Sequence, residues 1–248
     1  MKDLKNSKVV IITGCASGIG KSVVDKYLSK GFFVIGIDKI QRDYKENFMM
    51  LQADLSVEDD VKRLYKIISD KFSEIDYLIN CAGIFCETER AHISNISLSE
   101  WNSVINNNLN SCLLVVKNFL PLLKNNQKDK GIVFISSDQS EWPRSKNCAY
   151  STSKGAINTF AKACAVEFLE YGIRVNVVEP ASVETNFIRK MVSTEDEMHS
   201  IYDKENAKMP MGIIKPDEVA EFVYFLGSPK SVKITGQKIL IDSGLYLK

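Results

Sequence analysis

A short β-branched stretch that leads into a glycine-rich loop and then into a helical pattern is the feature that constrains this chain most. Residues 8–13 read KVVIIT, which favours a strand buried on both faces. A loop from Thr13 to Gly20 follows, and apolar residues then recur with helical period up to Gly31, a helix C-cap. Glycines let a backbone approach a pyrophosphate, and the helix start presents free N–H groups to it. This order predicts a dinucleotide-binding unit.

Strand-like and helix-like runs alternate along the rest of the chain. Apolar and β-branched runs suit strands at six further places: residues 32–37, 48–52, 77–79, 131–135, 173–178 and 238–241. Helical periodicity separates them, most clearly in residues 57–72, 98–124, 150–170 and 216–226. The alternation predicts one α/β domain of the Rossmann type over residues 1–248, a doubly wound seven-stranded parallel sheet with helices on both faces.

Residues 184–211 do not continue this alternation, because they are charged, rich in methionine and weakly patterned. Long segments of this kind in a compact domain often close over a binding site. We therefore expect a substrate lid here, with Trp142, Arg144 and Phe187 shaping the pocket beneath it. Arg144 either meets an anionic group or is solvated.

Charge and cysteine usage exclude several classes of protein. The chain has 32 Lys+Arg against 31 Asp+Glu, so it has no overall field for nucleic acid or an anionic membrane. Its first residues are too charged for a secretory signal, and no apolar run approaches a membrane span, which favours a cytoplasmic location. The six cysteines lack C-x-x-C spacing and there are two histidines, which favours reduced thiols over a metal site.

Polar residues stand at the expected strand ends. Asp38 lies 18 residues beyond Gly20, where a carboxylate accepts the ribose hydroxyls of NAD and repels a 2′-phosphate. Lys39 softens that exclusion of NADP, but NAD is favoured over NADP.

Asp54 follows the third strand and either caps the next helix or contacts adenine, and both readings remain open. Ser136 and Ser137 end the fifth strand, at the edge where ligands bind.

Tyr150 and Lys154 lie four residues apart at the start of a helical run. At this spacing both side chains rise on one face and can share a ligand. A free tyrosine has a pKa of about 10, and a nearby cation and the helix dipole are expected to lower it. Tyr150 would then donate and accept protons near neutral pH. The alternative is that both residues lie on a helix surface without a special role.

Two further polar patterns lie in the expected helix at residues 98–124. Ser97 to Glu100 has the spacing of a capping box. Asn106, Asn107 and Asn108 are consecutive, and asparagine is a middling helix former. At least one of these three side chains is therefore expected to serve in hydrogen bonding.

Taken together, these motifs resemble those of the short-chain dehydrogenase/reductase family, in its compact single-domain branch. The resemblance runs from about residue 7 to residue 244 and rests on Thr13-Gly-x-x-x-Gly-x-Gly20, Asn80-x-Ala-Gly83, Asn108, Ser137 and Tyr150-x-x-x-Lys154. The gap between Ser137 and Tyr150 also matches the family, which favours Ser137 over Ser136.

The resemblance implies catalytic roles for four residues. Tyr150 would exchange a proton with the substrate oxygen, Ser137 would hydrogen-bond that oxygen, and Lys154 would lower the tyrosine pKa and hold the nicotinamide ribose. Asn108 would anchor a water that relays protons. Residues implied to bind the cofactor are Gly14, Ser17, Gly18, Ile19, Gly20, Asp38, Asp54, Leu55, Asn80, Ala82, Gly83, Tyr150, Lys154, Pro180, Val183 and Thr185.

The implied function is an NAD-dependent oxidoreductase acting on a secondary alcohol or ketone. The alternatives are an NADP-dependent carbonyl or 3-oxoacyl-thioester reductase, and a nucleotide-binding sensor without turnover. Members of the family assemble as tetramers or dimers, which here would involve the helices at 98–124 and 150–170. Four positions depart from the usual pattern: Cys81, Ser111, Ala181 and Ser243.

Overall fold

Seven parallel strands form the centre of the molecule. The computed structural model describes residues 7–42, 46–86, 91–124, 129–185, 187, 192 and 194–247. In spatial order the strands are β3 (Phe48–Gln52), β2 (Phe33–Asp38), β1 (Val9–Thr13), β4 (Tyr77–Asn80), β5 (Lys130–Ile135), β6 (Ile173–Pro180) and β7 (Lys238–Ile241). Each predicted strand is present within about two residues, and the predicted fold class is confirmed.

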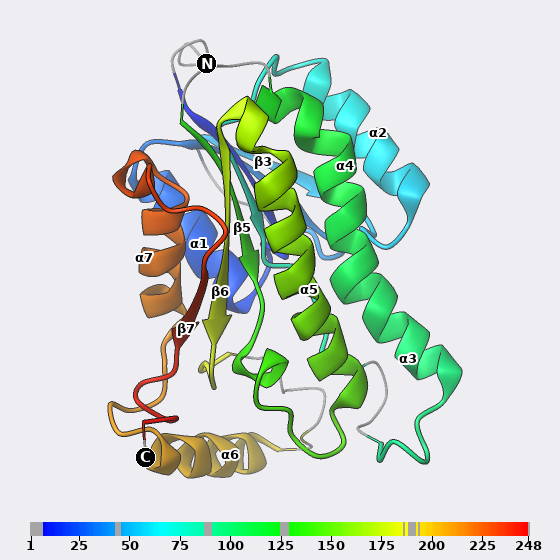
Figure 1. Ribbon diagram of the computed structural model, residues 1–248, viewed down its shortest axis with the longest axis vertical. Helices are drawn as coiled ribbons and strands as arrows, with labels where there is room; N and C mark the ends of the chain where they lie inside the picture. Colours follow the sequence, from blue (N-terminus) through cyan, green and yellow to red (C-terminus); the bar gives the residue numbers. More distant parts are fainter. Residues whose placement is uncertain are drawn as a thin grey trace.

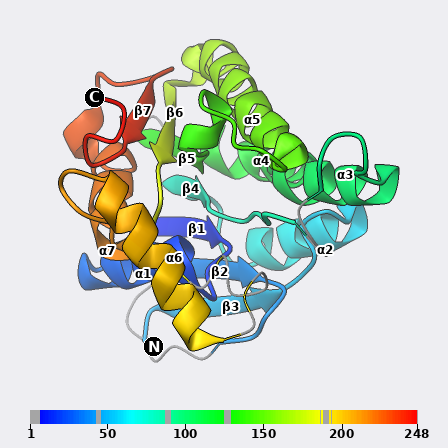
Figure 2. The ribbon, with the colours of Figure 1, turned by 90° about the horizontal axis from the view of Figure 1, so that it is seen from below.

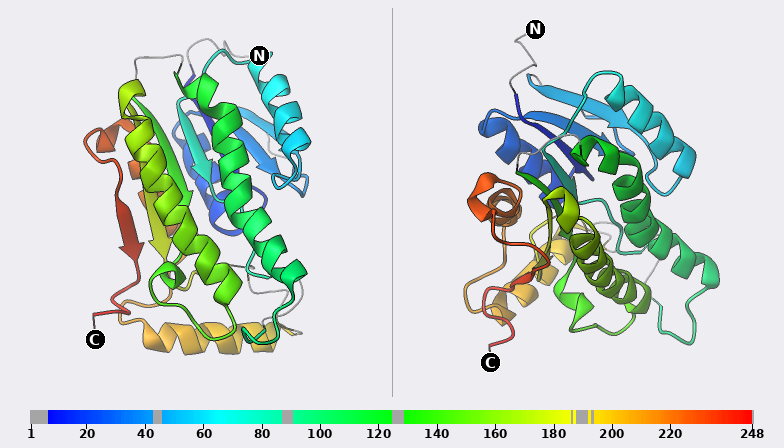
Figure 3. Two further views of the ribbon diagram at one scale, coloured as in Figure 1. Left: turned by 45° about the vertical axis from the view of Figure 1, so that its right-hand side comes forward. Right: turned by 45° about the horizontal axis from the view of Figure 1, so that its top comes forward.

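Helices cover both faces of this sheet (Figure 1). On one face lie α1 (Gly18–Ser29) and α7 (Pro216–Leu226), which pack against each other. On the other lie α2 (Glu58–Ser69), α4 (Ser111–Lys124) and α5 (Cys148–Glu167), with α4 and α5 side by side (Figure 3). Each face has its own hydrophobic core, in which the alternate side chains of the strands meet the helices.

The order in which the strands are added to the sheet reverses at β1, which has β2 on one side and β4 on the other. In a doubly wound sheet the ligand crevice opens at this point, outside the carboxyl ends of the strands. Helix α6 (Glu195–Lys208) crosses that edge of the sheet (Figure 2). It lies within the predicted lid at 184–211, of which residues 186, 188–191 and 193 lie outside the described residues.

The helix predicted at 98–124 is not continuous. It consists of α3 (Leu98–Ile105), a π-helical turn at Asn106–Asn110, and α4. Ser97 caps α3 by accepting a hydrogen bond from the backbone N–H of Glu100 at 3.1 Å. Insertions of this kind in a helix frequently mark functional sites, and here the turn contains the three consecutive asparagines.

Within the described part of the chain no helix is long and apolar enough to span a membrane. The same residues contain no group of three or more His, Cys, Asp or Glu side chains that could hold a metal ion. All six cysteines are free thiols.

Candidate active site

The glycine-rich loop after β1 has no room for side chains at two of its glycines. Gly14 has a φ of 65°, and a Cβ there would lie 2.8 Å from the backbone of Ala82. A Cβ on Gly20 would lie 1.9 Å from the carbonyl oxygen of Gly14. Ser17 is the N-cap of α1, but its side chain makes no capping hydrogen bond. The first turn of α1 therefore offers its N–H groups to a ligand at the switch point of the sheet.

Asp38 turns its carboxylate towards this loop. Its Oδ2 accepts a hydrogen bond from the backbone N–H of Ala16 at 2.9 Å, and its Oδ1 accepts one from Ile40 at 3.1 Å. Lys39 points elsewhere, because its ammonium lies 2.9 Å from Asp54 Oδ2 and 2.9 Å from Asn107 Oδ1. The cation next to Asp38 is thus already paired.

Asp54 does not cap the helix that follows it, since the N-cap of α2 is Val57. Its Oδ1 instead accepts hydrogen bonds from the backbone and hydroxyl of Ser56, at 2.9 and 2.6 Å. Burial opposes ionisation of Asp54, but the bonds from Ser56 and Lys39 outweigh it and hold the pKa of Asp54 below its usual value. Of the two readings for Asp54, helix capping is wrong.

The amide nitrogen and the oxygen of the Asn108 side chain all take part in hydrogen bonds. Its amide nitrogen donates to Ile84 O and to Ser153 Oγ, both at 2.9 Å, and its Oδ1 accepts from the Ile84 N–H at 2.7 Å. The expectation that one of the three asparagines serves in hydrogen bonding is confirmed. These bonds tie the loop after β4 to α5. Asn108 lies in the π-helical turn, and its side chain is completely buried.

Ser136 and Ser137 point in different directions at the end of β5. Ser136 Oγ donates to the backbone oxygen of Lys154 at 2.9 Å and so joins strand to helix. Ser137 is hydrogen-bonded to Tyr150 and also donates to Asp138 Oδ1 at 2.9 Å. The choice of Ser137 as the residue facing Tyr150 agrees with this geometry.

Tyr150 is buried, with 7% of its surface exposed, so the surface alternative is wrong. Its ring lies 4.6 Å from the ring of Phe85 and 6.2 Å from that of Phe187, centroid to centroid. Burial raises the pKa of Tyr150 well above its ordinary value of 10, with a further contribution from the charge of Asp138. The expected lowering of this pKa is therefore wrong for the protein alone, because desolvation outweighs the hydrogen bond with Ser137 and the charge of Arg144, which both act to lower the pKa of Tyr150.

Lys154 lies on the same face of α5, one turn further on. Its ammonium is 5.6 Å from the centre of the Tyr150 ring and donates to the backbone oxygen of Ile135 at 2.9 Å. Burial lowers the pKa of Lys154 from its ordinary value of 10.5 to about 8. A lysine with this pKa changes charge close to physiological pH.

This shift predicts a pH dependence of stability. Because the folded pKa lies below the unfolded one, the unfolded chain binds more protons between about pH 8 and pH 10.5, and Lys154 makes the protein more stable as pH rises through this window. The shift corresponds to roughly 3 kcal/mol. We expect urea unfolding to show this gain for the wild type relative to Lys154→Met, in which no group titrates at this position. Parallel pH profiles of the two proteins would contradict it.

The loop, the strand ends and α5 enclose a cavity of about 620 Å³. Its lining includes most of the residues predicted for a cofactor and for catalysis: Gly14, Ser17, Gly18, Ile19, Gly20, Asp38, Asp54, Leu55, Ala82, Gly83, Ser137, Tyr150, Lys154, Pro180, Val183 and Thr185. Asn80 and Asn108 are buried and do not line it. The Asn80 side-chain nitrogen has no hydrogen-bond partner in the described structure.

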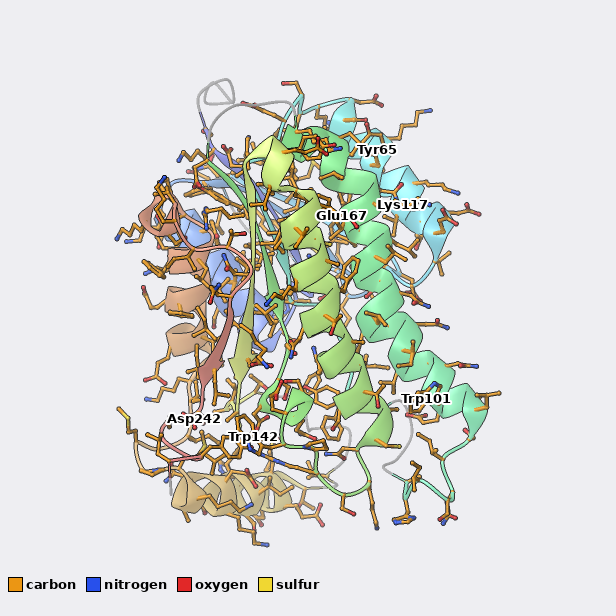
Figure 4. The ribbon with its side chains drawn as sticks, viewed as in Figure 1. Tyr65, Trp101, Lys117, Trp142, Glu167 and Asp242 are labelled. Atoms are coloured by element: carbon orange, nitrogen blue, oxygen red, sulfur yellow. The ribbon has the colours of Figure 1, made fainter. Side chains whose placement is uncertain are left out.

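Several residues of the cavity were not found from the sequence. They include Phe85, Asp138, Gln139, Asn147 and Ser182, and also Tyr202 and Glu205, for which only the lid segment at 184–211 was predicted. Phe187 and Arg144 line the cavity as expected, but Trp142 does not. The Trp142 ring stacks on Tyr246 at 3.9 Å, near Asp242 and the α6 end of the molecule (Figure 4). The sequence signal for the first five of these residues was weak because they lie in loops and short turns between the regular elements, where periodicity is absent.

Arg144 is not a free anion-binding group. Its guanidinium lies 3.1 Å from Asp138 Oδ2 and 3.4 Å from Glu205 Oε2. Glu205 on α6 also accepts a hydrogen bond from Ser182 at 2.7 Å. Arg144 thus meets anionic groups of the protein itself and joins the end of β5 to α6.

Comparison with known proteins places this geometry in a family. The family model described as short chain dehydrogenase matches residues 8–196, more than half of the chain. The chain is a short-chain dehydrogenase. It is accordingly an NAD(P)-dependent oxidoreductase, and the predicted family is confirmed.

Relatives of this short-chain dehydrogenase differ in what their names say they act on. It is 32% identical to the 3-oxoacyl-[acyl-carrier-protein] reductase FabG of Buchnera aphidicola, over 98% of both chains. It is 30% identical to glucose 1-dehydrogenase 2 of Bacillus subtilis, over 99% of this chain and 97% of the relative. The aldohexose dehydrogenase of Thermoplasma acidophilum superposes with a TM-score of 0.90 at 30% identity, over 98% of this chain and 95% of that one.

The residues present fit the nicotinamide cofactor that short-chain dehydrogenases use. The backbone around Gly14 and Gly20 leaves the space that a side chain would fill. The carboxylate of Asp38 beside the loop suits ribose hydroxyls. Thr185 closes over the loop from the other side, since a Cβ on Gly18 would lie 3.3 Å from its methyl group.

Proposed function

We propose that the chain is an NAD-dependent oxidoreductase acting on a secondary alcohol or its ketone, with Tyr150 as general acid and base. One observation carries the proposal: Tyr150, Ser137 and Lys154 line the same cavity as the glycine-rich loop and Asp38. A substrate carbon held beside Tyr150 would thus lie in the same cavity as a dinucleotide bound at the glycine-rich loop.

In this proposal each side chain has a defined task. The bound cofactor would supply or accept the hydride. Tyr150 holds a proton at its phenolic oxygen and gives it to a ketone oxygen, or takes one from an alcohol. Ser137 hydrogen-bonds the same substrate oxygen, which places it against Tyr150. Lys154 on α5 provides positive charge at the end of β5, while Asn108 fixes the loop after β4.

The preference for NAD rests on Asp38 and Lys39. The Asp38 carboxylate beside the loop would repel a 2′-phosphate, and Lys39 is already paired with Asp54. One residue favours the alternative: Arg42 is close enough to the loop to oppose the rise that burial and Asp38 cause in the Cys15 pKa. The solved structure of ElxO, 27% identical with a TM-score of 0.87, is described with NADP bound. An NADP-dependent reductase of 3-oxoacyl thioesters is therefore the second candidate.

Fluorescence titration with NADH and NADPH distinguishes these candidates. We expect the wild type to bind NADH more tightly, and Asp38→Ser to lose roughly tenfold or more of that preference, because a charge-assisted bond to ribose and a repulsion of phosphate are removed together. Asp59→Ser, on the exposed face of α2, is the matched control and should change neither affinity. Tighter binding of NADPH by the wild type would overturn the NAD assignment.

A panel of secondary alcohols and ketones, followed by NADH absorbance, tests the reaction itself. The panel should contain aldohexoses and 3-oxoacyl thioesters, because relatives are named for them. If NADH binds but no member is turned over, that result would favour the alternative of a nucleotide-binding sensor without turnover.

We also propose that the chain assembles into a homo-oligomer through α4 and α5, whose outer faces carry exposed apolar side chains. Leu113 is 48% exposed on α4, and Val166 and Leu169 near the end of α5 are 66% and 61% exposed. Light scattering should then give a mass that is a multiple of 27.9 kDa. Val166→Glu should reduce this mass, because it places a charge on the proposed interface.

A further inference from the structure

Gln139 and Asn147 line the cavity but have no role in the proposed chemistry. Gln139 lies two residues after Ser137, in a short 3₁₀ turn that Ser137 caps by accepting the Gln139 backbone N–H at 3.2 Å. Asn147 lies three residues before Tyr150 and is the N-cap of α5. Both side chains thus come from backbone next to the two residues proposed to hold the substrate oxygen.

The two amide side chains hold each other in one orientation. Asn147 Nδ2 donates to Gln139 Oε1 at 2.7 Å. Gln139 and Asn147 are more than nine-tenths buried, with 6% and 4% of their surfaces exposed. An amide group has an oxygen that accepts hydrogen bonds and an NH₂ that donates them. Because Asn147 occupies the oxygen of Gln139, the NH₂ group of Gln139 must point elsewhere.

The NH₂ group of Gln139 is a donor without an acceptor. Among the described residues Gln139 Nε2 donates to no protein group, and unlike the unpaired Asn147 Oδ1 it is not fully enclosed by protein atoms. Since Gln139 is almost completely buried and lines the cavity, this donor reaches the cavity. The hydroxyl of Ser182 on the same wall is already engaged, because it donates to Glu205 at 2.7 Å.

Asn147 holds Gln139 at a cost to its own hydrogen bonding. At the N-cap of a helix an asparagine oxygen ordinarily accepts from a backbone N–H of the first turn, but the Asn147 side chain makes no capping hydrogen bond. Its Oδ1 is buried and unpaired within the described structure, which is uncommon in native proteins. Departures of this kind from a local rule are concentrated at functional sites.

The charged groups on this wall of the cavity favour hydroxyl groups. The carboxylates of Asp138 and Glu205 line it, and a carboxylate only accepts hydrogen bonds. They therefore attract a hydroxyl proton and repel an anion or a carbonyl oxygen. Arg144 is already shared between these carboxylates at 3.1 and 3.4 Å, and Lys208 is paired with Glu205 at 2.6 Å. An anionic substrate would meet Asp138 without gaining either of these two cations.

We propose that Gln139 binds a hydroxyl group on a carbon close to the reacting carbon, so that the chain acts on neutral hydroxylated ketones and the corresponding diols or sugars. The proposal rests on the proposed function, whose substrate class it names. Gln139 Nε2 donates to the hydroxyl oxygen, and the hydroxyl proton faces the carboxylates of the wall. Asn147 is a positioning residue, because it fixes the Gln139 amide without touching the substrate.

The test compares 3-hydroxy-2-butanone with 2-butanone, which share a carbon skeleton and differ by one hydroxyl group. The measured quantity is the ratio of their kcat/KM values for reduction by NADH, in which a general loss of activity cancels. We expect this ratio to fall about tenfold in Gln139→Met, because a hydrogen bond to a buried polar group is lost. Methionine keeps the length of the side chain and removes both polar atoms.

Asn147→Leu tests the positioning role. Without the bond from Asn147 the Gln139 amide turns freely, so the ratio should fall in this variant as well, although by less than in Gln139→Met. A purely structural role of Asn147 would lower the melting temperature and leave the ratio unchanged, and that result would remove Asn147 from the proposal.

Gln237→Met is the matched control, because it makes the same change at an exposed glutamine that does not line the cavity. Its ratio should equal that of the wild type. Methyl acetoacetate, a neutral 3-oxo ester, tests the preference for a hydroxyl group. If its kcat/KM relative to 2-butanone falls as much in Gln139→Met as that of the hydroxy ketone, the subsite takes a carbonyl group and the proposal is wrong. An unchanged ratio in Gln139→Met would overturn it too.

A binding measurement separates this proposal from the proposed function. In Tyr150→Phe with bound NADH, reduction no longer consumes the cofactor, and quenching of NADH fluorescence reports the Kd of each ketone. The preference for 3-hydroxy-2-butanone should fall about tenfold when Gln139→Met is added to this variant. If the wild type reduces no ketone but this preference is present and depends on Gln139, the proposed function is wrong and the subsite stands. Turnover without dependence on Gln139 rejects the subsite alone.

Discussion

Tyr150→Phe is expected to lower kcat for alcohol oxidation and ketone reduction by a factor on the order of 10² to 10⁴, the contribution of a positioned acid or base. The substitution removes one oxygen and leaves the ring in contact with Phe85 and Phe187. The packing of α5 should therefore persist. NADH should bind with nearly unchanged affinity, measured by fluorescence titration, because the loop and Asp38 are untouched.

Tyr65→Phe provides the comparison for this variant. Tyr65 lies on α2, packed against the ring of Phe119 and far from the cavity (Figure 4). Its loss of a hydroxyl should leave kcat at the wild-type value. Retention of substantial activity by Tyr150→Phe would remove Tyr150 from the chemistry and with it the proposed mechanism.

Gly20→Ala is expected to have the largest effect on the cofactor site. A Cβ at this position would lie 1.9 Å from the carbonyl oxygen of Gly14, a contact with backbone that no rotamer change can relieve. The loop or α1 must move, which should cost about 3 kcal/mol of unfolding free energy or more. Urea unfolding measures this loss, and the stabilisation that NADH gives the wild type in thermal melts should disappear.

Gly155→Ala in α5 is the matched control, because it makes the same chemical change in another helix. Among the described residues, a Cβ there would meet only Ser140 O, at an ordinary 3.7 Å. Alanine is the better helix former by about 1 kcal/mol, so this variant should be as stable as the wild type or more so. Equal destabilisation of both variants would show that the close approach of Gly20 to the Gly14 carbonyl oxygen is not the cause of the lost stability.

The sequence was most informative where one physical requirement acts on consecutive residues. Buried parallel strands need apolar runs, and helices on a sheet need a 3.6-residue period, so the order of the elements was predictable. The loop from Gly14 to Gly20 was recognisable because close backbone approach excludes other residues. Tyr150 and Lys154 were placed on one face by helix geometry alone.

The parts that were not predictable depend on contacts between distant segments. The pKa of Tyr150 was expected to fall, because the sequence shows a neighbouring lysine but not the burial that dominates. Nothing local connects Asp138 to Tyr246, which are 108 residues apart. The interruption of the helix at Asn106–Asn110 likewise follows from the inward turn of Asn108 to Ile84, a tertiary contact.

The stack of Trp142 on Tyr246 has a practical consequence for handling the protein. The tail from Asp242 onward folds back beneath the reaction centre, whereas Val9 opens the sheet at the opposite edge (Figure 1). An affinity tag fused to the carboxyl end of the chain would crowd the aromatic pair and disturb the Asp138 carboxylate, to which the Tyr246 hydroxyl donates. Purification handles therefore belong ahead of β1, and kinetic constants from carboxyl-terminal fusions should be compared with those of cleaved protein.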